Sequence, residues 1–291
     1  MAGKLQSSAG NRRWRWFANH MASWLAVLAT ILVIAPLVAI FVDLVYKGAS
    51  SLNVNFFIKL PVPPGEHGGG MANAILGSAV LLGIASALGI PVGIAAGIYL
   101  AEYGRGTKLS NLVRFTADVL NGVPSIVMGI AVYALIVVPE KGFSAFAGGV
   151  VLGIVMVPTV ARTTEEMLLM VPHSIREAAL GLGVPNWRSM LSITLKTALP
   201  GVITGCMLAF ARVAGETAPL LFTAFGSSFF STALNQPIEA LPLQIYVYAL
   251  GPYDEWHRLA WAGSLVLIVL IVASVALVRY VTTRGALKGA S

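Results

Sequence analysis

Long apolar runs, separated by short polar stretches, dominate this sequence of 291 residues. Each run is long enough to cross a bilayer as a helix, which takes about 20 residues. Only 11% of the residues are charged, whereas soluble domains carry about 25%. The sequence therefore predicts an all-α polytopic membrane protein with six transmembrane helices. The expected spans are 24–46, 71–101, 112–138, 145–168, 198–224 and 259–281.

The distribution of lysine and arginine predicts the orientation of these spans. Of the 19 basic residues, fourteen fall in the two tails and in the loops on their side of the membrane, and four fall on the other side. Basic residues concentrate on the cytoplasmic side, so we expect both termini in the cytoplasm. The protein would then be a multi-pass protein of a bacterial inner or plasma membrane. The same bias explains the net charge of +7 better than a nucleic-acid-binding surface does.

The chain divides into three parts along its length. Residues 1–70 are expected to hold a basic cytoplasmic tail, the first transmembrane helix and an outer loop. The first apolar run is longer than the roughly 7–15 residues of a signal-peptide core, so we expect it to remain as an anchor. Residues 71–281 form the expected core of five helices, which includes a cytoplasmic loop at 171–197. Residues 282–291 form a second cytoplasmic tail.

Two further patterns concern helix packing and the outer surface. Gly89, Gly93 and Gly97 recur every four residues, which predicts a seam where two helices approach closely. The outer loop 225–258 contains an apolar piece, Leu241–Leu250, that we expect to form a short interfacial or re-entrant helix. This loop is either a docking surface for an external partner or an ordinary connection.

The loop between the fourth and fifth spans has the pattern of a short helix-turn-helix. Ser174 and Glu177 fit a capping box, in which each side chain accepts a hydrogen bond from the other residue's backbone N–H. Gly183 permits a sharp turn. The residue before Pro185 avoids the helical region, so the first helix should end there and a second should start near Asn186.

Arg212 and Glu216 stand inside the predicted fifth span, four residues apart and therefore on one face of a helix. An arginine at the bilayer centre costs about 2.5–3.5 kcal/mol, so it needs a partner or an aqueous path. One interpretation is a structural ion pair. The other is an anion pathway, in which the guanidinium binds phosphate-type oxygens and Glu216 accepts a hydrogen bond from a protonated oxyanion. Thr217 joins this pathway, and Asp118 and Asn121 are either further pathway residues or helix caps.

The loop also resembles a family motif. Glu177-Ala178-Ala179, three residues, Gly183, nine residues and Ile193 match the EAA loop of ABC-importer permeases. In that pattern a proline stands where this chain has Lys196, so the turn into the fifth span is expected later, at Leu199-Pro200. Four other segments are similar to phosphate-import permeases of the PstA family, and the similarity covers about residues 70–280. These segments are Asn121–Gly129, Ala161–Met167, Arg212–Pro219 and Leu241–Tyr246.

The resemblance implies a type I ABC importer permease fold and import of inorganic phosphate by alternating access. It implies that Glu177, Ala178, Ala179 and Gly183 receive the motion of an ATPase, and that Arg212 and Glu216 act in phosphate passage. It also implies the partners: a homologous PstC-like permease, a PstB-like ATPase dimer that binds the ATP, and a PstS-like phosphate-binding protein.

Other functions remain open at this stage. An ABC permease for sulfate, molybdate or phosphonate would share the EAA loop, and a secondary transporter or channel would need no ATPase. The chain has no Gly-x4-Gly-Lys-Ser/Thr phosphate loop, so we expect it to lack an ATPase site of its own. The four histidines have no metal-ligand spacing and no nucleophile–base pair is evident, so we expect no catalytic residues, metal or cofactor. Cys206 has no partner cysteine and is expected to be a small core residue.

Overall fold

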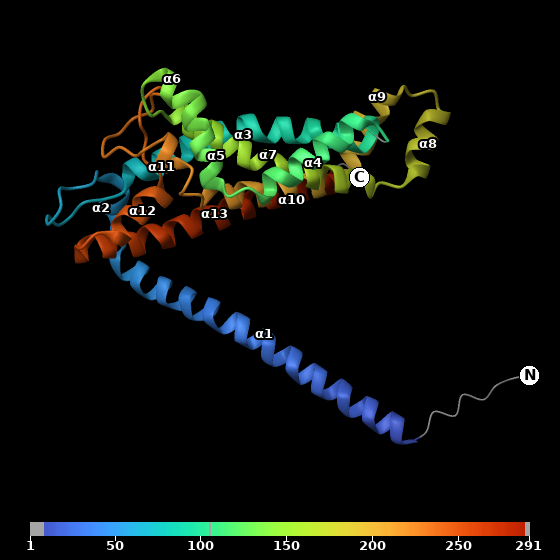
Figure 1. The fold of residues 1–291 in the computed structure, drawn as a ribbon, viewed down its shortest axis with the longest axis horizontal. Coiled ribbons are helices and arrows are strands. Elements are labelled where there is room, and N and C mark those ends of the chain that lie inside the picture. Colours follow the sequence, from blue (N-terminus) through green and yellow to red (C-terminus); the bar gives the residue numbers. More distant parts are fainter. Residues whose placement is uncertain (1–8, 105, 289–291) are drawn as a thin grey trace, which may run out of the picture.

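The computed structural model describes residues 9–104 and 106–288, and these are almost entirely helical (Figure 1). Residues 1–8 of the predicted basic tail, Arg105 and residues 289–291 of the predicted C-terminal tail lie outside the described part. The α-helices are α1 Ala9–Ser51, α2 Val54–Ile58, α3 Ala72–Ile98, α4 Lys108–Gly122, α5 Ser125–Val132, α6 Val138–Glu140, α7 Ala145–Leu169, α8 His173–Gly181, α9 Asn186–Ser189, α10 Leu195–Ala214, α11 Leu220–Thr223, α12 Leu241–Leu250 and α13 Asp254–Lys288. Three π-helical stretches join some of them: η1 Tyr99–Tyr103, η2 Tyr133–Val137 and η3 Met190–Thr194.

The described helices confirm a polytopic all-α fold. Five of them are long and apolar enough to cross a membrane, and a sixth span results if one bent pair of helices counts as a single span. The short helix expected at Leu241–Leu250 is also present, as α12.

The bent pair replaces the continuous third span predicted at 112–138. Its two arms, Lys108–Gly122 and Ser125–Glu140, meet at an angle of 106°. Val123 between them is extended, with ψ 131°. The cause is Pro124, because the residue before a proline avoids the helical region.

The fifth span is also displaced from its predicted position at 198–224. The helix runs from Asn186 to Ala214 through η3 and α10, and it ends at Gly215. The apolar residues at 220–223 form the separate short helix α11. The apolar sequence continues beyond Gly215, whereas the helical backbone does not. The prediction therefore placed the end of the fifth span too late.

The core lies where α3, α7 and α10 pack together. The predicted glycine seam of α3 is confirmed, and it contacts α7. A Cβ added at Gly93 would lie 2.6 Å from Val160 Cβ, and one at Gly97 would lie 2.6 Å from Thr164 Cβ. Such approach is possible only without side chains at these positions. Cys206 is buried in the same core, as expected for a small core residue.

Helix α1 stands apart from this core. Figure 1 shows it leaving the bundle at a steep angle, with contact only near its C-terminal end, where Gly48 meets Leu265 of α13. The apolar side chains along the rest of its described length are exposed. In a membrane protein such a helix surface faces lipid or another protein chain.

The elements α2, α11 and α12 gather at one end of the bundle, and α8 and α9 lie at the other end, near the last turns of α13 (Figure 1). At the first end, Glu239 lies in the loop that precedes α12, with its carboxylate beside Gly226. Burial raises the pKa of Glu239 from 4.5 to about 7, although the backbone N–H groups of Ala240 and Ser227 oppose the rise. The folded loop therefore holds this proton to a higher pH than the unfolded chain does.

This difference predicts that alkaline pH destabilises the loop at 225–240. Its contribution to stability is fully present below about pH 4.5, and it falls as pH rises through about 7, by up to about 3 kcal/mol. Hydrogen exchange of the loop should accordingly be faster at about pH 8 than at about pH 5, after correction for the intrinsic rate. Glu239→Gln should remove this dependence, whereas Glu66→Gln, at an exposed position, should retain it. An unchanged pH dependence in Glu239→Gln would contradict the prediction.

Candidate functional site: a coupling helix and a charged turn

The EAA segment forms a short helix and a tight turn at one end of the bundle. Helix α8 begins at His173 with Pro172 as its N-cap and ends at Gly181. Gly183 has a φ of 79° and makes the turn. A left-handed residue is tolerated best as glycine, which explains this residue type at this place.

The predicted capping box at Ser174 and Glu177 is wrong. Ser174 is already the second residue of α8, and the N-cap makes no side-chain hydrogen bond. The physical reason is Pro172, whose fixed φ suits the start of a helix, so the helix begins before Ser174 can cap it. Glu177 and Ala178 are consequently exposed, and Ala179 alone of the three EAA residues is buried.

The second helix begins at Asn186 as predicted, but it does not stop before the membrane. It continues through η3 into α10 as one helical run to Ala214. Lys196 and Pro200 lie within this run, so the later turn expected at Leu199-Pro200 is wrong. The EAA turn is therefore connected by unbroken helix to the segment that carries Arg212.

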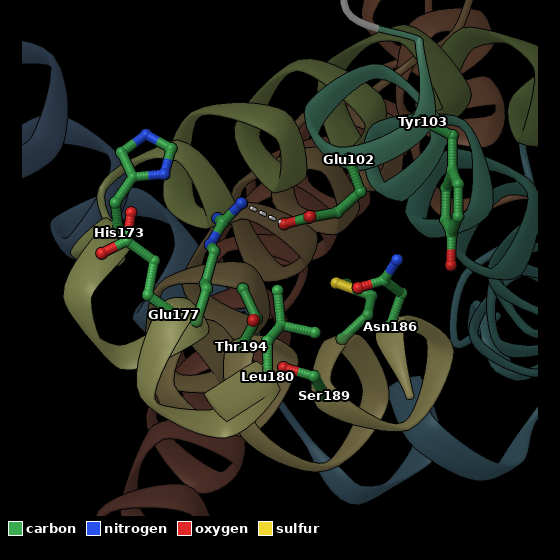
Figure 2. Close-up of a pocket in the computed structure, with 10 residues that line it drawn as sticks. Glu102, Tyr103, His173, Glu177, Leu180, Asn186, Ser189 and Thr194 are labelled. Carbon is green, nitrogen blue, oxygen red and sulfur yellow. Dashed lines mark ion pairs between the residues drawn. The ribbon is translucent and has the colours of Figure 1, made fainter. Parts of the chain in front are cut away.

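A cleft of about 320 Å³ separates α8 from the ends of the neighbouring helices (Figure 2). Glu102 and Tyr103 of η1 line one side, and residues of α8, α9 and η3 line the other. Its full lining is Glu102, Tyr103, His173, Arg176, Glu177, Leu180, Asn186, Ser189, Met190 and Thr194.

The Arg212–Glu216 pair does not form as predicted. Arg212 lies in the last turn of α10 with its side chain exposed. Within the described residues it makes no ion pair. Because the helix ends at Ala214, Glu216 lies outside it and no longer shares a helix face with Arg212. Thr217 follows in the same turn, where its carbonyl accepts the Leu220 N–H at 3.1 Å.

Glu216 instead contacts the break in the third span. Its Oε2 accepts a hydrogen bond of 2.8 Å from the Ser125 hydroxyl, at the first residue of α5. Nearby, a Cβ on Gly129 would lie 2.7 Å from Pro219 Cα, so the two segments pack closely. Ser125 was not among the predicted site residues. The only signal for it in the sequence is Pro124, which marks the break.

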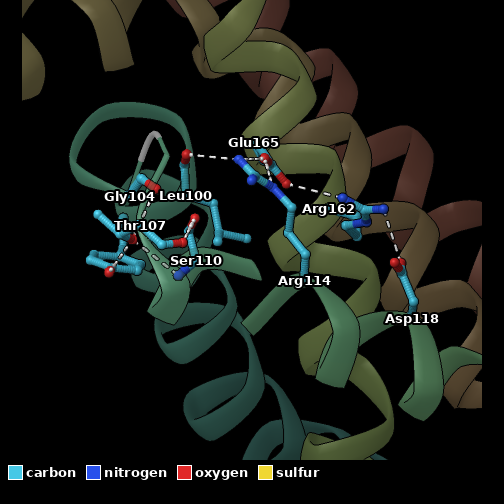
Figure 3. A network of polar contacts seen from close by, with 9 residues as sticks. Leu100, Gly104, Thr107, Ser110, Arg114, Asp118, Arg162 and Glu165 are labelled. Atoms are coloured by element: carbon cyan, nitrogen blue, oxygen red, sulfur yellow. Dashed lines mark hydrogen bonds and ion pairs between the residues drawn. The ribbon is translucent and has the colours of Figure 1, made fainter. Parts of the chain in front are cut away.

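Asp118 and Asn121 lie on α4 and do not cap a helix. Asp118 forms an ion pair of 2.9 Å with Arg162 of α7. Arg162 also contacts Glu165 at 3.3 Å, and Glu165 is paired at 2.8 Å with Arg114 of α4 (Figure 3). This network joins α4 to α7. Asn121 lies in the last turn of α4 with an exposed side chain.

No group of three or more histidine, cysteine, aspartate or glutamate residues in the described ranges could hold a metal ion. At the charged turn, the exposed guanidinium of Arg212 and the carboxylate of Glu216, which accepts a hydrogen bond from Ser125, are four residues apart in the sequence.

Comparison with known proteins identifies the family. Residues 89–285 match the family model described as the binding-protein-dependent transport system inner membrane component. The chain is 44% identical to the phosphate transport system permease protein PstA of Yersinia pestis, over 92% of this chain and 91% of that protein. It is 45% identical to the protein of the same name from Xylella fastidiosa strain Temecula1, over 89% and 90% of the two chains. The chain belongs to the PstA family of permeases.

Solved structures support the fold of this PstA-family permease. It resembles the membrane chain of the MetNI methionine ABC transporter in an inward-facing conformation, with a TM-score of 0.57 and 21% identity. The match covers 74% of this chain and 94% of that chain. The family and the fold make the protein a multi-pass membrane component of an ABC transporter, which acts with other subunits.

Proposed function

We propose that this permease carries inorganic phosphate across the inner membrane of a bacterium, driven by ATP that a separate subunit hydrolyses. One observation carries the proposal. The EAA helix α8 exposes Glu177 and Ala178, and its turn leads by unbroken helix to the exposed Arg212. An ATPase docked on α8 is therefore close in the chain to the helical run that ends at the charged turn.

The charged turn supplies the substrate contacts in this proposal. The Arg212 guanidinium binds phosphate oxygens, for which its planar fork is suited. Glu216 accepts a hydrogen bond from the proton of monohydrogen phosphate, a proton that sulfate lacks, and Ser125 orients its carboxylate. Thr217 lies beside them, and Asp118 and Asn121 line the path on α4.

Membership of the family supports three partners in this proposal. A PstC-like permease completes the membrane pathway, a PstB-like ATPase dimer binds the ATP, and a PstS-like protein delivers phosphate from outside. Both termini and α8 then lie in the cytoplasm, in agreement with the excess of basic residues on that side. In this arrangement the chain needs no cofactor and no catalytic residue of its own.

A matched pair of glycine variants tests the coupling role of the EAA turn. Gly181 and Gly183 both have open space where a Cβ would be added, but only Gly183 has a positive φ, of 79°. Alanine there costs about 1–2 kcal/mol of backbone strain. Gly183→Ala should therefore reduce co-purification of the ATPase about 5- to 30-fold, whereas Gly181→Ala should leave it unchanged.

Phosphate uptake by vesicles that contain the complete transporter is the direct test of the function. Saturable, ATP-dependent uptake of labelled phosphate, not displaced by sulfate, is the expected result. Uptake by the purified chain alone, without an ATPase, would contradict the proposal, as would equal uptake of sulfate.

A further inference from the structure

The inner face of α8 carries a contact that the EAA motif does not include. Arg176 precedes Glu177, and their side chains leave the helix about 100° apart. Its side chain is 12% exposed, and Ala179, three residues on, is buried on the same face. Helix α8 therefore has an inner face that holds Arg176 and Ala179 and an outer face that exposes Ala178. Glu177 is exposed and lies between these faces, where it also lines the cleft.

Arg176 joins α8 to two transmembrane helices at once. Its Nη1 forms an ion pair of 2.5 Å with Oε1 of Glu102, which lies in η1 at the end of α3. Its Nη2 donates a hydrogen bond of 2.6 Å to the carbonyl of Leu168 in the last turn of α7. Carbonyls at a helix end lack partners within their own helix, and arginine often satisfies them. The ion pair appears beside Glu102 in Figure 2.

The backbone alone does not fix the angle of α8. It is joined to α7 through residues 170–172 and to α9 through residues 182–185, and neither segment belongs to an α-helix. No covalent link runs from α8 to α3. The Arg176 contacts supply this connection, and they reach the α3–α7 pair, which the glycine seam packs into one unit.

We propose that Arg176 is a positioning residue that makes α8 move as one body with α3 and α7, so that movement of the ATPase reaches the transport pathway. This inference rests on the proposed function. It adds to the coupling a largely buried arginine on the inner face of α8, beside the exposed Glu177 and Ala178. Without Arg176, α8 would still present its outer face to the ATPase. A displacement of α8 would then bend the two connecting segments and would not move α3 and α7.

The test measures the coupling ratio, which is the number of phosphate ions imported for each ATP hydrolysed. The complete transporter is reconstituted in vesicles with the wild-type chain or with Arg176→Gln. We expect the ratio to fall about tenfold, as is typical for loss of a coupling interaction, while ATP hydrolysis and ATPase co-purification stay within about twofold. A merely structural role would lower uptake and hydrolysis together.

Three further variants sharpen the result. Glu102→Gln should lower the ratio as Arg176→Gln does, and the double variant should be no worse than either single variant, because both remove one interaction. The charge exchange Glu102→Arg with Arg176→Glu should restore part of the ratio. Arg188→Gln is the control, since Arg188 lies on α9 in the same loop and is exposed, and it should keep the wild-type ratio.

Several outcomes would overturn the role of Arg176: an unchanged ratio in Arg176→Gln, an equal fall in Arg188→Gln, or additive losses in the double variant. If Arg176→Gln does not accumulate in the membrane, an unchanged ratio in Glu102→Gln overturns the role instead. Failure of the proposed function has a different signature, because the wild-type vesicles themselves would then hydrolyse ATP without importing phosphate.

Discussion

Arg212→Gln is expected to lower phosphate uptake about 10- to 100-fold, the range set by loss of one or two charge-assisted hydrogen bonds worth about 1.5–3 kcal/mol. Arg212 is exposed at the end of α10 and makes no ion pair with another described residue. Its guanidinium is thus available to an anion, and no buried carboxylate loses its partner when the charge is removed. Glutamine keeps much of the length of the side chain, so the fold and the assembly with the ATPase should be retained.

The measurement is uptake of labelled phosphate over a range of concentrations, together with the yield of the purified complex. Arg258→Gln is the control, because Arg258 is 61% exposed and forms only a surface ion pair with Glu255. Such pairs contribute about 0–1 kcal/mol. Normal uptake by Arg212→Gln, or an equal loss with Arg258→Gln, would show that Arg212 does not meet the substrate.

Gly93→Val is expected to destabilise the folded protein strongly. A Cβ at this position would lie 2.6 Å from Val160 Cβ and 2.7 Å from Val160 Cγ1. These atoms belong to the packed interface of α3 with α7, so the helices must separate to admit a side chain. Overpacking of a tight core costs about 1–3 kcal/mol and sometimes more, and the β-branched valine should place this case at the upper end.

Gly83 provides a matched control on the same helix. A Cβ there would have no neighbour within 4 Å, and the change of residue type within α3 is identical. Thermal unfolding of the detergent-solubilised protein should show a large loss for Gly93→Val and little change for Gly83→Val. Equal unfolding temperatures for the two variants would mean that the seam is not a tight contact in the membrane.

Most of the helical framework could be predicted from the apolar runs. Lipid offers no hydrogen bonds to the backbone, so a run of sufficient length must form a helix. The predicted helix bounds were wrong where an apolar run and a helix do not coincide. Hydropathy continues past Gly215, where α10 ends, and across Pro124, where the third span bends by 106°. Backbone geometry determines where such helices end. A hydropathy average is taken over side chains and therefore does not detect it.

The candidate site was predicted only in part for a related reason. Arg212 and Glu216 are conspicuous because charges are rare in an apolar run, but their pairing was inferred from a helix that ends between them. The partner that Glu216 has, Ser125, is 91 residues away in the sequence. Similarly, the motif Ser174-x-x-Glu177 satisfied the capping pattern, whereas Pro172 started the helix earlier.

The sequence by itself determined the class of protein, most of its apolar helices, the helix-turn of the EAA loop and the resemblance to phosphate permeases. These properties depend on composition and on short-range spacing, which the chain carries at every stage of folding. Only the tertiary structure decided which polar side chains meet: Glu216 with Ser125, Asp118 with Arg162, and Arg176 with Glu102. Those contacts join helices that are distant in the chain, so they exist only after close packing has brought the helices together.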